Sequence, residues 1–364
     1  MFRTGRILAV AVFAAAIAAI IPACNKSSSS GKPLVAFISN NSFEFWTIAE
    51  KGTQAAARET GVDCQFEKPP SGGTAEDQRR IIEDLMVKGV KAIAISPKDA
   101  KNQGEFLKEI NAKIPLIAVD SDVTDPSARR CYLGTDNIAA GRATGKLLKE
   151  ALPKGGKFMI FVGKLDVQNA VERRHGLVTE LAGGEEKCGP QLQQLKDAKY
   201  PVKFGDFELL DTRTDNESQS TCKAKAEDAL AQYGDLAAMV GLWAYNPPAM
   251  LEAVKGATNK HEKVVLIGFD ENDETLQGIR DGQIAGTVVQ DPYNFGYESV
   301  KIMAAYAKGS GDAELAARKD INKDKQIYIR HRIINRDGKP GKLTADEKIE
   351  AVDPFQAKLK ELKK

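Results

Sequence analysis

From Lys32 onward, short runs of apolar and β-branched residues alternate with longer stretches in which apolar positions recur every three or four residues. The short runs are typical of buried strands, and the longer stretches are typical of amphipathic helices. In the first half, the pattern predicts strands at 33–39, 62–66, 90–95 and 114–119, separated by helices at 45–60, at 74–89 and around Phe106 to Ile110. Such an alternating series predicts a doubly wound lobe built on a parallel sheet.

The same alternation resumes after residues 130–134 and predicts a second lobe. A helix is expected at about 138–152, and strands are expected at 157–162, 207–210, 237–242, 264–269 and 286–289. The predicted fold class is therefore α/β, with two doubly wound parallel-sheet lobes. Residues 183–205 are too irregular to assign, and we expect a surface excursion there. Residues 337–364 are expected to form a charged tail, with a short surface helix or a frayed end over 354–364.

The first 23 residues have the pattern of an export signal. Arg3 and Arg6 precede an apolar run over 7–21, which is short for a bilayer span. The following Pro22-Ala23-Cys24 is similar to a bacterial lipoprotein box, in which Cys24 is diacylated and becomes the mature N-terminus. Ordinary cleavage or an uncleaved anchor are the alternatives. Under the lipoprotein interpretation, residues 24–31 form a flexible tether, and the protein lies in the periplasm or cell envelope, anchored to a membrane.

Charge and cysteine content narrow the classes of partner. Without the signal, 50 basic and 50 acidic residues remain, so nothing favours nucleic acid as a partner. The chain beyond the signal is long enough for two domains. No Cys or His cluster has the spacing of a metal site, and no cofactor motif occurs, so we expect neither a bound metal ion nor a cofactor. Cys188 and Cys222 could form a disulfide or remain buried free thiols, and both alternatives stay open.

Polar and aromatic side chains follow the predicted strands of both lobes. In an open α/β sheet, the loops at the carboxyl ends of the strands converge on one crevice. Carboxylates, amides and guanidinium groups can each engage neighbouring hydroxyls, while aromatic faces cover the C–H faces of a sugar ring. A neutral polyol is therefore the ligand class that these residues suit best. A single strand-end Asp or Asn could instead cap a helix or a turn, but capping alone does not explain their convergence in both lobes.

Over residues 32–336 the chain resembles the periplasmic sugar-binding proteins of ABC importers, of the ribose-binding type. The resemblance is carried by several motifs: Asn40-Asn41 with Phe45-Trp46, Ala118 to Asp122, Leu133 to Asn137 with Gly141-Arg142, Gly268 to Asp270, and Thr287 to Pro292. It implies three crossings between the lobes, near 135–137, 290–291 and 326–328. The expected N-terminal lobe is then 32–135 plus 292–325, and the C-terminal lobe is 136–291 plus 326–336.

The resemblance also implies ligand-binding roles. The best-matched positions are Asn41, Phe45, Trp46, Asp120, Asp270 and Gln290, and the second-rank positions are Arg213, Tyr245 and Asn246. Ser96, Ser121 and Asn169 are also expected to bind the ligand. Three positions depart from ribose binders: Ser96 replaces an asparagine, and Ser121 and Val171 each replace an arginine. The loss of both arginines, together with a gain of Trp243, suggests a polyol other than ribose.

The expected function is capture of a monosaccharide or related polyol between the lobes and its delivery to an ABC permease. A sensor module that hands its closed form to a membrane kinase or chemoreceptor is the main alternative. A glycosidase using Asp120 and Asp270 as its carboxylate pair is a minor one, because no nucleophile elbow, metal box or phosphate loop accompanies them. No enzyme activity is therefore expected. The export signal and the lack of a helix-turn-helix exclude a cytoplasmic repressor.

Overall fold

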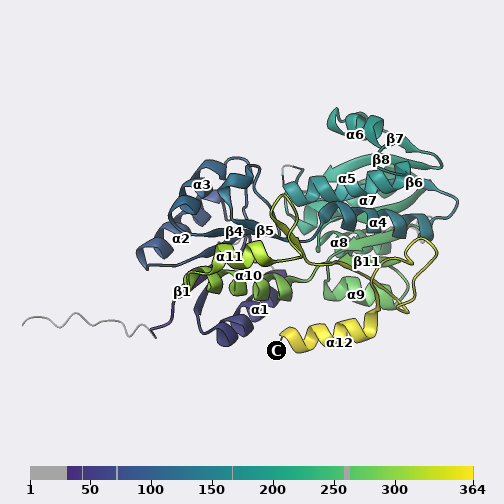
Figure 1. Cartoon of the computed structure of the whole chain (residues 1–364). Coiled ribbons are helices and arrows are strands. Elements are labelled where there is room, and N and C mark those ends of the chain that lie inside the picture. The colour runs from purple at the N-terminus through teal and green to yellow at the C-terminus, as the bar shows by residue number, and fades with distance from the viewer. Residues whose placement is uncertain (1–30, 43, 71–72, 166, 258–262, 364) are drawn as a thin grey trace, which may run out of the picture. The chain divides into compact units, whose positions relative to one another are not determined.

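A computed structural model describes residues 31–42, 44–70, 73–165, 167–257 and 263–363. The predicted signal and Cys24 lie outside these residues, as does His261. The first sheet contains β1 (Leu34–Ile38), β2 (Asp63–Glu67), β3 (Ile93–Ile95), β4 (Leu116–Val119), β5 (Cys131–Gly134) and β12 (Gln326–Tyr328). Its order is β12-β5-β4-β3-β1-β2, and every pair is parallel (Figure 1). The first five strands thus form the predicted doubly wound lobe.

The first lobe is covered by α1 (Glu44–Thr60), α2 (Ala75–Val87), α3 (Gly104–Lys113), the short 3₁₀ helix η1 (Pro126–Ala128), α10 (Pro292–Ala307) and α11 (Gly311–Ala317). Thr74 and Asp77 form the capping box that begins α2. Helices α1 and α10 pack closely, because a Cβ on Gly52 would lie 2.0 Å from the Tyr293 carbonyl oxygen. The chain therefore returns to the first lobe after residue 291.

The second sheet contains β6 (Gly156–Val162), β7 (Val202–Phe204), β8 (Phe207–Thr214), β9 (Leu236–Gly241), β10 (Val265–Phe269), β11 (Gly286–Val289), β13 (Arg332–Asn335) and β14 (Ile349–Ala351). Its order is β14-β13-β11-β10-β9-β6-β8-β7. The parallel strands β8-β6-β9-β10-β11 repeat the order of the first lobe, while β7 and β13 are antiparallel to their neighbours β8 and β11. Two lobes of the same topology result, which confirms the predicted fold class.

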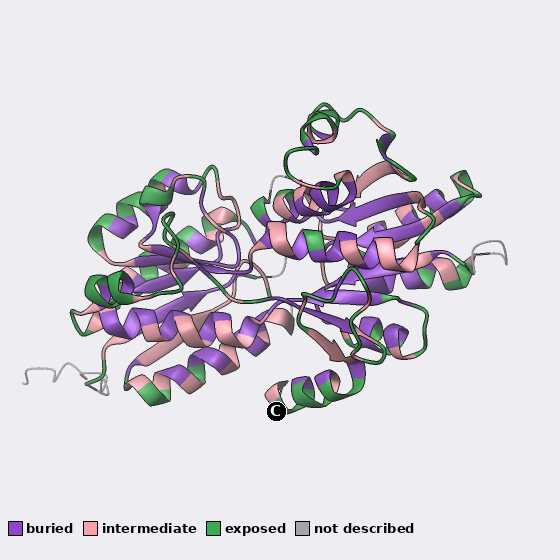
Figure 2. Cartoon of the chain, turned by 45° about the vertical axis from the view of Figure 1, so that its right-hand side comes forward, coloured by how far each residue is buried: buried purple, intermediate pink, exposed green. Residues whose placement is uncertain are grey.

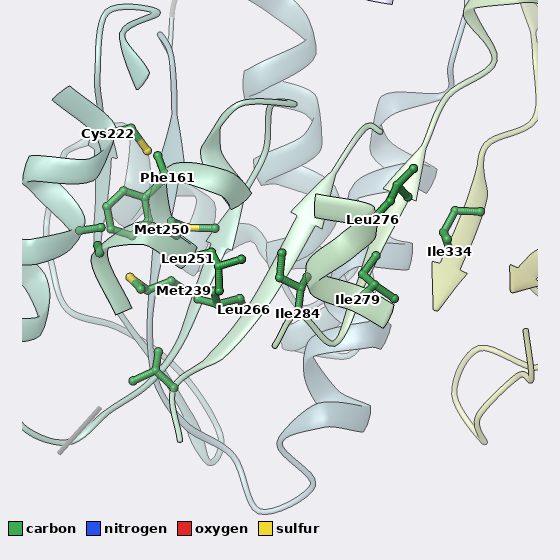
Figure 3. Close-up of a cluster of buried hydrophobic side chains, with 14 of the residues drawn as sticks. Phe161, Cys222, Met239, Met250, Leu251, Leu266, Leu276, Ile279, Ile284 and Ile334 are labelled. Atoms are coloured by element: carbon green, nitrogen blue, oxygen red, sulfur yellow. The ribbon is translucent and has the colours of Figure 1, made fainter. Parts of the chain in front are cut away.

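The helices of the second lobe are α4 (Asn137–Ala151), α5 (Gln168–Ala182), α6 (Gly189–Lys196), α7 (Gln219–Gln232), α8 (Asn246–Gly256), α9 (Asp273–Arg280) and α12 (Val352–Lys363). In Figure 2 the central strands of both sheets are buried, whereas the helices expose one face. Figure 3 shows one core cluster of this lobe, in which Phe161 and Met239 from the sheet pack with Met250 and Leu251 of α8. The sheet and its helices thus share an apolar layer.

Three expectations about the chain's organisation were wrong. Residues 183–205 are not irregular, because they contain α6 and the edge strand β7. The C-terminal segment is not a charged tail, because β14 joins the second sheet and α12 buries Val352, Phe355 and Leu359. β12 pairs with β5 in the first sheet, so the third crossing falls between Tyr328 and Arg332 rather than at 326–328.

The cysteines present in the described part of the chain are unpaired. Cys131, Cys188 and Cys222 are buried free thiols, and Cys64 is half-buried. The disulfide alternative for Cys188 and Cys222 was therefore wrong. Among the helices that the structure describes, none combines the length and apolar character needed to cross a bilayer.

Candidate functional site

A cavity of about 320 Å³ is lined by loops that follow the strands of both sheets. This volume lies at the lower end of the range for small-molecule sites. Its lining residues are Asn40, Asn41, Phe45, Trp46, Pro97, Lys98, Asp120, Val167, Asn169, Arg173, Glu217, Gln219, Trp243, Ala244, Tyr245, Asp270, Glu271, Asn272 and Gln290. Nearly all of them follow strand ends, as the rule for open α/β sheets requires.

Two buried aspartates come from the two lobes. Asp120 follows β4 and accepts hydrogen bonds from the hydroxyls of Ser96 (3.1 Å) and Ser121 (3.3 Å). Asp270 follows β10 and accepts a hydrogen bond from Nε2 of Gln290 (2.8 Å). Burial raises the pKa of both carboxyl groups, that of Asp120 to about 6. Each aspartate is therefore held by few partners and keeps acceptor capacity for a ligand.

Arg173 of α5 is the cation that faces both aspartates. Its guanidinium stacks on the Phe269 ring, 3.8 Å from the ring centroid, and lies 3.7 Å from Oδ2 of Asp270. Its Nε donates to Oδ1 of Asn137, and its Nη1 donates to the carbonyl of Leu242, both at 2.9 Å. The side chain is almost fully buried, so its position is fixed by contacts within the second lobe. Its positive charge acts against the effect of burial, so the pKa values of Asp120 and Asp270 are raised less than burial alone would raise them.

Aromatic side chains contribute to both walls. In the first lobe, the rings of Phe45 and Trp46 are in edge contact, and Nε1 of Trp46 donates to Oδ1 of Asn40 (3.0 Å). Trp46 is only 2% exposed, so it presents little of its surface to the cavity. In the second lobe, Nε1 of Trp243 donates to Oδ1 of Asn169 (3.3 Å). These rings can cover the apolar face of a small ring-shaped ligand.

Trp243 owes its position to a glycine. A Cβ on Gly163, which directly follows β6, would lie 1.7 Å from Cζ3 of Trp243. No other residue type can occupy position 163 while the indole stays in this place. The absence of a side chain at Gly163 therefore provides the space for the aromatic wall of the second lobe.

Polar bridges tie the two lobes at the cavity. Nζ of Lys98, in the first lobe, lies 3.8 Å from Oε2 of Glu217 in the second and donates to the Asn40 carbonyl (3.2 Å). Nδ2 of Asn169 donates to Oγ of Ser121 (3.4 Å) across the same gap. Glu217 also pairs with Lys164 (3.1 Å). The two lobes thus already contact one another through side chains at the cavity.

The model of the periplasmic binding protein domain matches residues 9–311. The chain belongs to the periplasmic binding protein family. The ribose import binding protein RbsB of Haemophilus influenzae is 24% identical over 291 residues, covering 79% of this chain and 89% of the relative. The D-allose-binding periplasmic protein of Escherichia coli K12 is 26% identical over 270 residues, covering 71% and 79%.

Solved structures share the fold of this periplasmic binding protein. A carbohydrate transporter solute binding protein from Agrobacterium radiobacter superposes with a TM-score of 0.73 at 21% identity, covering 91% of this chain and 99% of that one. The two α/β lobes joined by three crossings are the type I periplasmic binding protein fold.

Most of the residues that the sequence singled out line the cavity of this binding protein. They are Asn41, Phe45, Trp46, Asp120, Asn169, Tyr245, Asp270 and Gln290. Ser96 and Ser121 lie behind this wall, where they donate to Asp120. Asn246 is also behind it, because its Nδ2 donates to Oδ2 of Asp215 (3.0 Å) while the Tyr245 hydroxyl donates to Oδ1. These three positions support the lining rather than form it.

Arg213 was wrongly assigned to the lining. Its guanidinium donates to the carbonyl of Lys225 (2.7 Å) and to Oε1 of Gln232 (3.1 Å), and it lines a separate shallow pocket beside α7. Arg213 lies within β8, where successive side chains point to opposite faces of the sheet. Its nearness to the end of the strand therefore did not determine where its side chain points.

The inferred loss of the second-lobe arginine was also wrong. Val171 is exposed, but Arg173 brings a guanidinium into the cavity from the same helix. Two positions along an α-helix differ by a rotation of about 200°, so Val171 and Arg173 lie on nearly opposite faces, and of these two only Arg173 faces inward. Other polar and aromatic lining residues that were not among the predicted ligand-binding residues are Asn40, Lys98, Glu217, Gln219, Trp243, Glu271 and Asn272. All of these except Gln219 lie within a few residues of a strand end, which was the available signal.

His175, Glu185 and Cys188 form the group of described residues that could ligate a metal ion, since their ligand atoms lie within 4.8 Å of one another. Nε2 of His175 lies 3.0 Å from Oε1 of Glu185, and the Thr179 hydroxyl donates to Oε2 of Glu185 (3.1 Å) and lies 3.4 Å from Sγ of Cys188. None of these four residues lines the cavity. This group therefore belongs to the packing of α5 against the segment that leads into α6.

Proposed function

We propose that this protein captures a sugar in the cavity between its lobes and delivers it to an ABC importer. The observation that carries the proposal is the pairing of Asp120 and Asp270, one from each lobe, at a single cavity that also holds Trp243 and Phe45. Carboxylates accept from ring hydroxyls, and aromatic rings cover the C–H face. The names of the relatives, a ribose import binding protein and a D-allose-binding protein, agree with this chemistry.

The binding groups in this proposal are the predicted residues that line the cavity, together with Arg173 and Trp243. Because hydrogen bonds from a ligand would join residues of both lobes, ligand binding favours the closed arrangement. The three connections that would flex are residues 135–136, 290–291 and 329–331. The closed form is then the shape that a membrane permease recognises. No bond is made or broken in this cycle, so the proposed protein is a carrier and not an enzyme.

Membrane attachment through Cys24 is the second part of the proposal. It rests on the basic start, the apolar run and the cysteine that follows Ala23. Metabolic labelling with an alkyne fatty acid should mark the wild-type chain, and the Cys24→Ala variant should lose the label and leave the membrane fraction. An unlabelled wild-type chain would replace this proposal with ordinary cleavage or an uncleaved anchor.

A thermal-shift screen of the full chain against pentoses, hexoses, pentitols and disaccharides tests sugar capture. A ligand at about a thousand times its dissociation constant adds roughly 4 kcal/mol to the folded state, which moves the midpoint by several degrees. Unfolding and refolding beforehand removes any retained ligand. A shift with one sugar supports the proposal, and the absence of a shift with every sugar contradicts it. Co-purification with a permease or with a sensor kinase then separates the importer from the sensor alternative.

A further inference from the structure

The cavity holds more acidic than basic side chains. Its described lining contains the carboxyl groups of Asp120, Glu217, Asp270 and Glu271, but only two cationic groups, those of Lys98 and Arg173. Glu217 and Lys98 interact with each other, and Glu217 also pairs with Lys164, which lies outside the lining. The other three carboxyl groups of the lining are therefore accompanied by one cationic lining group, that of Arg173.

Gln290 adds an acceptor without a donor. Its side chain is only 2% exposed and lines the cavity, yet no described group donates to its Oε1. Its Nε2 donates to Oδ1 of Asp270 at 2.8 Å. The opposite orientation of the amide would set Oε1 against that carboxylate oxygen, so the hydrogen bond fixes Oε1 as a buried acceptor. A buried acceptor left unpaired is costly, which indicates that a ligand supplies the missing donor.

Glu271 shows the same deficit beside Gln290. Its Oε2 is shielded from solvent and has no donor among the residues described. Burial and, to a lesser extent, the charges of Asp270 and Asp291 together raise the pKa of Glu271 to about 8, although Arg332 acts in the opposite direction. Arg332 is already shared, since its guanidinium lies 3.5 Å from Glu350 and 3.9 Å from Asp291. No cation is therefore dedicated to Glu271.

We propose that the ligand is an amino sugar, whose protonated amine lies against Asp270, Glu271 and Gln290 while its hydroxyls engage the remaining polar groups. This inference rests on the proposed sugar capture. A neutral sugar supplies hydroxyl donors but no positive charge, so it cannot favour the ionised form of these buried carboxyl groups upon closure. An ammonium group supplies three donors and one positive charge to the acceptors that lack them.

Isothermal titration calorimetry of the full chain in detergent at neutral pH tests this inference with matched pairs. The pairs are D-glucosamine with D-glucose, D-galactosamine with D-galactose, and D-mannosamine with D-mannose, with each N-acetyl derivative as an uncharged analogue. At least one amine should bind about tenfold more tightly than its neutral partner, as expected for one charged hydrogen bond, and acetylation should abolish the gain.

The outcomes separate this inference from the proposed function. If the sugars that bind are all neutral, or if each amine binds no better than its partner, the amino-sugar inference is overturned and sugar capture stands. If no sugar binds in either the calorimetric or the thermal experiment, both are overturned.

Glu271→Gln tests the role of the carboxyl group directly. The variant keeps the shape and one acceptor but cannot ionise when the ammonium binds, so the ratio of amine to neutral affinity should fall about tenfold. Glu274→Gln on the exposed first turn of α9 is the matched control and should keep the wild-type ratio. An unchanged ratio in Glu271→Gln would overturn the assignment of the amine to this wall.

Proton release provides an independent readout. A bound ammonium lowers the pKa of the carboxyl groups that face it, Asp270 and Glu271, and to a smaller extent that of Asp120, so protons are released when the amine binds. The other charged groups acting on these carboxyls are Arg173, Arg332 and Asp291. The apparent binding enthalpy of the amine should therefore differ between phosphate and Tris buffers. Equal enthalpies in the two buffers would contradict the proposed contact.

Discussion

Asp120 and Asp270 have the same backbone conformation, with φ of 63° in each, at the ends of the equivalent strands β4 and β10. Each backbone N–H donates to the adjacent strand, to the carbonyl of Leu133 (3.1 Å) or of Val288 (2.7 Å). Each carbonyl accepts at 2.8 Å from a hydroxyl of that strand, from Tyr132 or from Thr287. The two lobes therefore place one carboxylate each by the same local device.

A positive φ is unusual for a residue with a side chain, and Asp is among the few that tolerate it. Here the paired hydrogen bonds to β5 and β11 hold the left-handed turn. The turn ends the strand abruptly and directs the carboxyl group into the cavity. The same geometry occurs at both sites, and such strain persists where the surroundings over-determine it, which supports the binding role proposed for the two aspartates.

Replacing either aspartate with asparagine should abolish tight sugar binding. Asp120→Asn and Asp270→Asn keep the size and the tolerance of positive φ, but each converts one acceptor into a donor. A ligand hydroxyl that loses a charged partner costs about 1.5–3 kcal/mol, or roughly ten- to a hundredfold in affinity. Isothermal titration calorimetry with the sugar identified in the thermal screen measures this change in affinity. Asp84→Asn on exposed α2 should bind normally, and normal binding in both cavity variants would refute the proposed site.

The raised pKa of Asp120 predicts a pH effect on stability. Because the folded value of about 6 lies above the ordinary value of 3.8, the folded protein binds the proton more tightly than the unfolded chain. Stability from this group is therefore present below about pH 4 and is lost as the pH rises to 6. The loss is about 3 kcal/mol at 1.4 kcal/mol per pKa unit.

Denaturation with urea across this pH range, in the absence of sugar, separates the contribution of Asp120 from those of other groups. Asp120→Asn should unfold at higher denaturant than wild type above pH 6, and the two proteins should converge toward pH 4. Arg173 and Asp270 are present in both proteins, so their contribution to stability largely cancels in the comparison. A variant that is less stable than wild type at neutral pH would show that Arg173 outweighs the burial effect.

The alternation of strands and helices was sufficient to predict both lobes, because each parallel strand is a continuous apolar run bounded by turn residues. Strand ends also located most of the cavity, since topology brings those loops together. Arg173 could not be found in this way, because it lies in the second turn of α5 and reaches the cavity only through the direction of its helix face. The short β14 was hidden among charged residues, since an edge strand exposes one side to water.

Arg173→Met should destabilise the folded protein. The variant removes the ion pair with Asp270, the hydrogen bonds to Asn137 and Leu242, and the contact with Phe269, and it leaves a buried carboxylate without its cation. Breaking such a pair typically costs about 3–5 kcal/mol. Calorimetry or circular dichroism should record a midpoint lower by several degrees. Arg174→Met, a change to the half-buried neighbour, provides the comparison, and an equal effect in both variants would contradict a special role for Arg173.

Gly163→Ala should displace Trp243. The added Cβ would lie 1.7 Å from the indole, well inside contact distance, so the ring must leave its position and the hydrogen bond to Asn169. We expect a shift in tryptophan fluorescence and a loss of sugar affinity with the secondary structure retained. Gly234→Ala is the control, because a Cβ there meets no atom within 4 Å. Unchanged fluorescence and affinity in Gly163→Ala would exclude Trp243 from the binding surface.

Phe355→Ala tests whether α12 is an integral part of the second lobe. Phe355 is 4% exposed and shares a core cluster with Val352, Leu359 and Ile334, and the guanidinium of Arg332 lies 5.3 Å from its ring centroid (Figure 1 shows α12 beside α9). Removing a buried phenylalanine side chain costs about 3–5 kcal/mol. The midpoint of thermal unfolding should therefore fall by several degrees, whereas Lys358→Ala on the exposed face should leave it nearly unchanged. Equal midpoints in Phe355→Ala and wild type would mean that α12 does not contribute to the stability of the lobe and that residues 352–363 behave in solution as the charged tail first expected.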